Sequence, residues 1–121
     1  MSEFIKKAFY ILEKDKRYKL QAYIFTVEAL HYKLKKIGKK RHLTARELLE
    51  GIVELGRKKY GLLAYEVFKS WGCRKTDDFG EIVFNLIEMG ELSKTEEDKK
   101  EDFYNVFDLR EELEKNYRFK E

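Results

Sequence analysis

The sequence predicts a mainly α, single-domain protein over residues 1–121, with five to six helices and a small C-terminal β-hairpin. Apolar residues recur every three or four positions along most of the chain, which is typical of helices that bury one face. Proline is absent, and most glycines fall between the apolar stretches, where helices end. With 43% hydrophobic and 15% aromatic residues, the chain can fill one core.

The first two helices are expected over residues 4–12 and 17–37. The second carries apolar side chains on two opposite faces and must therefore be covered twice. Its first stripe comprises Leu20, Tyr23, Ile24, Val27, Leu30 and Leu34. Its second stripe comprises Tyr18, Ala22, Phe25, Ala29 and Tyr32. The first helix could cover the second stripe, or this stripe could form the seam of a homodimer.

A third helix is expected over residues 45–60. Gly38 ends the helix before it, and Thr44 with Glu47 forms a T-x-x-E capping box at its start. Gly56 lies inside this helix, where glycine costs up to about 1 kcal/mol relative to alanine. We therefore expect another helix to approach it closely.

A short fourth helix is expected over residues 62–71, closed by Gly72. The aromatic residues in and beside it are typical of a core: Tyr60, Tyr65, Phe68 and Trp71.

The fifth helix is expected over residues 78–89, with Asp78 and Glu81 at its start. Its apolar residues cover a wide arc and leave only Glu81, Asn85 and Glu88 on a polar strip, which predicts that it is the central helix. Residues 92–94 and 103–107 are expected to pair as a hairpin across the acidic stretch 95–102. Asp108 caps a last helix that reaches about residue 117.

Three helices followed by a hairpin make this part of the chain partly winged-helix-like. The stretch from Asp77 to Glu91, which contains the expected recognition helix, however, has five acidic residues and no Lys or Arg. Like charge would oppose contact with DNA phosphates. A winged-helix-like frame that binds a protein remains open.

Charge is separated along the chain. Residues 1–76 carry 19 Lys and Arg against 8 Asp and Glu, whereas residues 77–121 carry 7 against 15. The densest basic cluster surrounds the end of the second helix, and we interpret it as a contact surface for the RNA or DNA backbone. Its residues are Lys33, Lys35, Lys36, Lys39, Lys40, Arg41 and Arg46.

Two simpler explanations of the basic cluster stay open. Lysines suit the negative C-terminal end of a helix, and a surface rich in Lys and Glu is typical of heat-adapted proteins. The leading hypothesis is therefore a non-catalytic interaction module, with nucleic acid as one partner. The alternative is a homodimeric protein-protein adaptor that uses the second stripe.

An enzyme is the remote alternative, because the sequence has no P-loop, dinucleotide fingerprint or G-x-S-x-G motif. Only Cys73, His31 and His42 could carry such a reaction. His31, beside Leu34, is expected to be a partly buried structural histidine. Their spacing does not suggest a metal site, so we predict no cofactor and no metal.

The expected location is the cytoplasm. No apolar run approaches the roughly 18 residues of a membrane span, and the N-terminus lacks the layout of a signal peptide. The single cysteine agrees with a reducing compartment.

Several segments together resemble a family of small uncharacterised bacterial proteins, over residues 4–108. They are DKRY at 15–18, AY at 22–23, EAL at 28–30, LLEGI at 48–52, WG at 71–72, TDDFGEIVFNL at 76–86 and KTEED at 94–98. The resemblance implies a free-standing bacterial module. It implies no activity, ligand or catalytic residue.

Overall fold

The structure is a computed structural model that describes residues 3–38, 41–94 and 98–114. Its elements are α1 (Glu3–Lys14), α2 (Leu20–Ile37), α3 (Ala45–Tyr60), the 3₁₀ helix η1 (Gly61–Leu63), α4 (Ala64–Ser70), α5 (Thr76–Glu88), the 3₁₀ helix η2 (Lys100–Phe103) and α6 (Leu109–Glu114). The prediction of a mainly α protein is confirmed.

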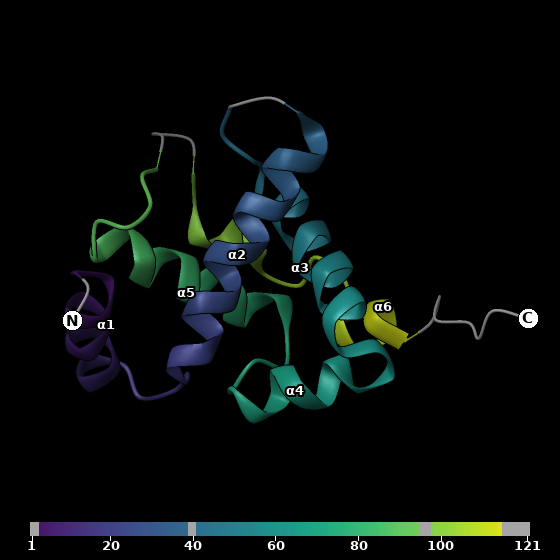
Figure 1. Ribbon diagram of the computed structural model, residues 1–121, viewed down its shortest axis with the longest axis horizontal. Helices are drawn as coiled ribbons and strands as arrows, with labels where there is room; N and C mark the ends of the chain where they lie inside the picture. Colours follow the sequence, from purple (N-terminus) through teal and green to yellow (C-terminus); the bar gives the residue numbers. More distant parts are fainter. Residues whose placement is uncertain (1–2, 39–40, 95–97, 115–121) are drawn as a thin grey trace, which may run out of the picture.

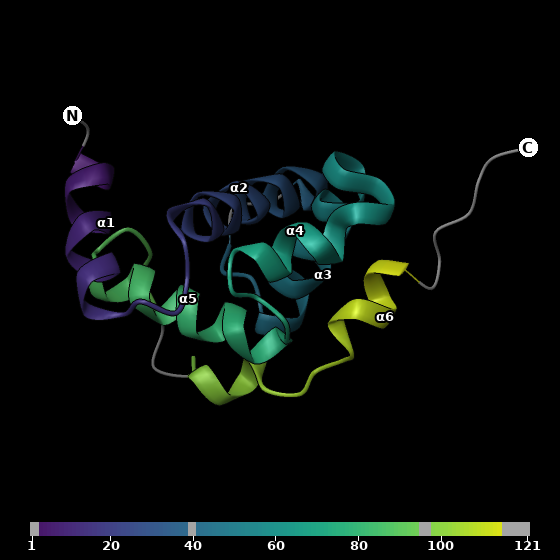
Figure 2. The same ribbon diagram turned by 90° about the horizontal axis from the view of Figure 1, so that it is seen from below.

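The helices α2 and α3 form an antiparallel pair in the middle of the molecule (Figure 1). α5 packs against both, and α1 lies beside α5 at one end of the molecule (Figure 2). α3 also contacts α4, α6 and both 3₁₀ helices, so it shares with α5 the central position predicted for α5 alone.

The start of α3 follows the predicted capping box. The Thr44 hydroxyl accepts the N–H of Glu47 at 3.1 Å, and the Glu47 carboxylate accepts the N–H of Thr44 at 2.9 Å. Gly38 ends α2 with φ of 79°, and its N–H donates to the carbonyl of Leu34. These groups satisfy polar backbone atoms that a helix end leaves without partners.

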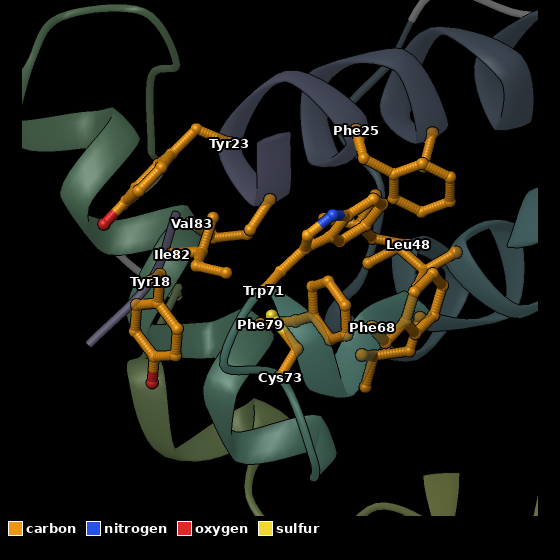
Figure 3. Close-up of a cluster of buried hydrophobic side chains, with 14 of the residues drawn as sticks. Tyr18, Tyr23, Phe25, Leu48, Phe68, Trp71, Cys73, Phe79, Ile82 and Val83 are labelled. Atoms are coloured by element: carbon orange, nitrogen blue, oxygen red, sulfur yellow. The ribbon is translucent and has the colours of Figure 1, made fainter. Parts of the chain in front are cut away.

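The second stripe of α2 faces an aromatic cluster contributed by α3, α4 and α5 (Figure 3). The ring centroids of Phe25 and Phe68 are 5.2 Å apart, and those of Phe68 and Trp71 are 5.5 Å apart. A Cβ on Gly56 would lie 2.7 Å from the Phe68 ring, so the predicted close approach at this glycine is confirmed. The predicted core role of the aromatic residues near α4 is also confirmed, with Phe68 and Trp71 buried and Tyr60 and Tyr65 half-buried.

The stripe that was predicted to form a homodimer seam therefore packs against other helices of the same chain. Tyr18, Ala22, Phe25 and Ala29 are buried, and Tyr32 is half-buried. The four buried side chains are not accessible to a second copy in this conformation. The helix α1 does not cover the stripe either, because α3 and α4 do.

The predicted C-terminal hairpin is wrong for the described residues, which contain no strand at 92–94 or 103–107. Phe103 instead ends η2 and packs on α5, where a Cβ on Gly80 would lie 2.6 Å from the Cβ of Phe103. The N–H of Asn105 donates to Asp77 and that of Val106 to Thr76. Because side chains at the start of α5 accept these donors, the segment needs no partner strand. The hairpin that was expected to form the wing of a winged helix is therefore absent from the described residues.

The predicted polar strip of α5 binds the N-terminal part of the chain. Asn85 donates to Asp15 and to the hydroxyl of Tyr23, both at 3.0 Å. Glu81 accepts from Arg17 at 3.2 Å, and Glu88 pairs with Lys14. These carboxylates serve contacts within the chain.

The link between α1 and α2 also meets the turn between α4 and α5. The N–H of Lys19 donates to the carbonyl of Trp71 at 3.1 Å, and the hydroxyl of Tyr18 donates to Asp78 at 2.7 Å. Gly72 has φ of +98°, and a Cβ there would lie 2.2 Å from the carbonyl oxygen of Arg17. Two segments that carry the family resemblance, 15–18 and 76–86, therefore interlock in the fold.

Candidate functional site

A pocket of about 260 Å³ lies on the other face of α2, between this helix, the start of α3, α5 and the segments near η2. Its apolar lining comes from elements far apart in sequence. The apolar residues are Leu30, Leu34, Leu43, Ala45, Leu48, Val83, Phe84, Ile87, Leu92 and Phe103.

The pocket exists because the first stripe of α2 is only partly covered. Leu30 and Leu34 belong to that stripe, and Phe84 and Ile87 come from the wide apolar arc of α5. All four are half-buried, whereas Ala22, Phe25 and Ala29 on the opposite face are buried. Space therefore remains between the side chains on this face.

The polar rim of the pocket comprises Arg41, His42, Thr44, Ser93, Asp98, Lys99 and Asp102. The Arg41 guanidinium makes two hydrogen bonds to Glu47, at 3.0 and 2.8 Å. This contact raises the pKa of Arg41. Together with the N–H of Thr44, it lowers the pKa of Glu47 to about 2. The charge of Arg41 is therefore already compensated.

Three rim groups make no hydrogen bond or ion pair with the described part of the chain: the His42 imidazole, the Lys99 ammonium and the Ser93 hydroxyl. All three residues are exposed. The two rim carboxylates differ from them, because Asp102 accepts the N–H of Lys99 at 3.4 Å and Asp98 has an interaction of its own. Lys99, His42 and Ser93 are thus the rim groups most able to bind a ligand.

Four of the seven predicted nucleic-acid contacts form ion pairs with three carboxylates of α3. Lys33 lies 3.4 Å from Glu54, and Lys36 lies 3.1 Å from the same carboxylate. Arg46 lies 3.5 Å from Glu50. With the Arg41–Glu47 pair at the start of α3, these contacts form a ladder of ion pairs, in which only the pairs of Lys33 and Lys36 cross from α2 to α3.

The rest of the predicted patch is smaller. Lys35 is exposed and makes no ion pair within the described ranges, and Lys39 and Lys40 lie outside the described residues. The structure brings Arg41 to the rim of the pocket and leaves Lys33, Lys35, Lys36 and Arg46 out of its lining.

The side chains considered for catalysis lie apart from the pocket, except His42. Cys73 is buried with 0% of its surface exposed, and burial, reinforced by the charge of Asp78, raises the pKa of its thiol. A thiol in this state is a poor nucleophile. His31 is exposed, so the predicted partly buried position is wrong. Among the described residues, no cluster of three or more His, Cys, Asp or Glu could hold a metal ion.

Sequence reasoning missed Ser93, Asp98, Lys99 and Asp102 as site residues. They lie in the segment interpreted as a hairpin and its acidic loop, whose path over α5 has no signature in the sequence. The signal that could have located the pocket was the pair of apolar faces on α2, because each face required packing against another part of the chain.

A scan against models of protein families, a search of curated proteins and a search of solved structures each give no match for this chain. The site is therefore interpreted from its own geometry. No helix in the described ranges has both the length and the apolar character to cross a bilayer.

Proposed function

We propose that the protein is a non-catalytic binding module and that the pocket beside α2 is its binding site. One observation carries this proposal: a largely apolar pocket of about 260 Å³ that no side chain of the described residues fills. A ligand that fully buried one side-chain-sized apolar group there would gain roughly 1.5–3 kcal/mol. Polar groups at the rim would set the orientation of the ligand, as in most small-molecule sites.

The non-catalytic part of the proposal is supported by where the reactive groups lie. The Cys73 thiol is buried in the core, and the Arg41 guanidinium is held by Glu47. The rim offers charge and hydrogen bonds for binding.

The test is a two-dimensional NMR titration with indole, a neutral apolar probe. We expect shifts of the backbone amides of residues that line the pocket, with saturation. Ala45 lines the pocket at the first turn of α3 and is half-buried. Ala45→Leu should fill the space and weaken binding by at least tenfold. Gln21→Leu adds the same side chain at an exposed position of α2 and should bind indole normally. Absence of shifts in the folded protein would refute the site.

A second candidate function is contact with a nucleic-acid backbone. It is favoured by the excess of Lys and Arg in residues 1–76. It is also favoured by two lysines at one aromatic ring, since Lys36 and Lys58 lie 5.8 and 5.7 Å from the Tyr32 centroid. The ion-pair ladder weakens the field that phosphates would meet, so this candidate ranks second.

Fluorescence anisotropy with labelled single-stranded RNA and duplex DNA at several salt concentrations tests this candidate. Binding through phosphates requires a steep decrease of affinity with salt. Replacing Lys35, Lys39 and Lys40 by Glu leaves the ion pairs of Lys36 and Arg41 in place and should abolish binding. Unchanged affinity in this variant would exclude the basic cluster as the surface that contacts nucleic acid.

We also propose that the protein is a cytoplasmic bacterial protein of the family that its sequence resembles. The polar contacts between segments 15–18 and 76–86 support this proposal, because they give several residues of the resemblance one shared structural role.

A further inference from the structure

We infer that the ligand of the pocket is a small amphipathic carboxylate, with its apolar group in the lining and its carboxylate at Lys99 and His42. This inference rests on the proposed function, because it names the class of ligand for the same pocket. It is drawn from the size of the pocket and from the pairing of its rim charges.

The size indicates one ring or branched chain with a short extension. An apolar cavity of about 150 Å³ admits a benzene ring. The pocket, at about 260 Å³, therefore has room for a ring and two or three further atoms. A polar group on such an extension would reach the rim.

The rim charges that already have a partner, and the one that does not, favour a single negative charge on the polar group of the ligand. Glu47 compensates Arg41, whereas the Lys99 ammonium has no partner among the described residues. The His42 imidazole is also unpartnered there and can donate a second hydrogen bond. An ammonium group would be repelled by Lys99.

The carboxylates of Asp98 and Asp102 limit the charge that the rim accepts. Both line the pocket. Asp102 is engaged by the N–H of Lys99, but its charge still opposes an anion. A monoanion is therefore favoured over a dianion such as a phosphate monoester.

The test compares three probes by NMR titration of the complete chain. The first is 3-phenylpropanoate, and the second is 3-phenylpropanamide, which has the same shape without the charge. We expect the carboxylate to bind about twofold to fivefold more tightly, the range for an exposed charged contact. Acetate, which lacks the apolar group, should not saturate the site at the same concentrations.

Two variants locate the charge contact. Lys99→Gln should remove most of the preference for the carboxylate and leave affinity for the amide unchanged. Lys35→Gln changes another exposed, unpaired lysine outside the pocket and should keep the preference. His42→Gln should reduce it by a smaller factor.

The outcomes separate the two proposals. Equal binding of carboxylate and amide would overturn the inference and leave the binding module standing. A preference that survives both Lys99→Gln and His42→Gln would also overturn it, because the carboxylate would then bind elsewhere. If indole and both phenyl probes leave the pocket amides unmoved, the proposed function fails and the inference fails with it.

Discussion

The two apolar stripes of α2 look alike in the sequence, but the structure packs one tightly and leaves a pocket against the other. On the closed face, Phe25 meets Phe68 and Trp71, and Gly56 lets the Phe68 ring lie directly on α3. On the pocket face, Leu30 and Leu34 meet side chains of α5 that leave space between them. An apolar stripe therefore predicts that other side chains cover it, while the volume of those side chains decides whether a pocket remains.

The largest expected difference between the two faces is in how much the free energy of unfolding falls when a side chain is removed. Phe68→Ala should lower the free energy of unfolding by about 3–5 kcal/mol, because it leaves a cavity in a closed cluster. Leu34→Ala, at the half-buried pocket wall, should cost about 1–2 kcal/mol. Urea unfolding followed by circular dichroism measures both. Equal costs would show that the pocket wall is packed as tightly as the cluster.

Adding volume should sharpen the comparison. Ala29 is fully buried on the closed face, and its carbonyl lies near Gly51 of α3. Ala29→Leu should therefore destabilise the protein by about 1–3 kcal/mol through overpacking. Ala45→Leu places the same side chain in the pocket and should change stability by less than about 0.5 kcal/mol. A large cost for Ala45→Leu, measured by the same urea unfolding, would mean that the pocket cannot accept a group.

The smallest expected effect is a response of the pocket edge to acid. Glu47 has its pKa lowered from 4.5 to about 2, mainly by Arg41. Its stabilising contribution is present above pH 4.5 and is lost as pH falls through 2. As the pH approaches 2, amides of residues 41–48 should shift before those of the aromatic cluster, as observed by NMR.

Glu47→Gln provides the test of this acid response. The variant should lose the early shift, because it has no carboxylate to protonate. Glu13→Gln changes an exposed residue without an ion pair in the described ranges and should retain the shift. Simultaneous shifts of both faces would show that acid acts on the whole fold.

Local features of the fold were predictable because they depend on neighbouring residues. Thr44 with Glu47, Gly38 at the end of α2 and Asp108 before α6 all act as expected, the last through the N–H of Glu111 at 2.9 Å. The start of α5 was predicted two residues late, because Asp78 accepts the N–H groups of Arg74 and Lys75 from inside the helix.

Long-range features were not predictable from the spacing of residues. Periodicity identified both stripes of α2 without saying which one a neighbour would fill. The basic cluster was visible, but Glu50 and Glu54 become partners of Lys33 and Lys36 only when α3 packs on α2. The segment after α5 was misread as strands because the acceptors for its N–H groups, Thr76 and Asp77, lie about thirty residues earlier.

The contacts that residues 15–19 make with the second half of the chain also limit the order in which the chain can fold. Lys19, Tyr18 and Asp15 bind partners at positions 71, 78 and 85. On a growing chain, α2 and α3 can therefore pair first, while α1 must wait until α5 has been synthesised. Contacts that form after the rate-limiting step affect unfolding more than folding. We accordingly expect Tyr18→Phe to speed unfolding and to leave the folding rate nearly unchanged, because the link between α1 and α2 joins a core that has already formed.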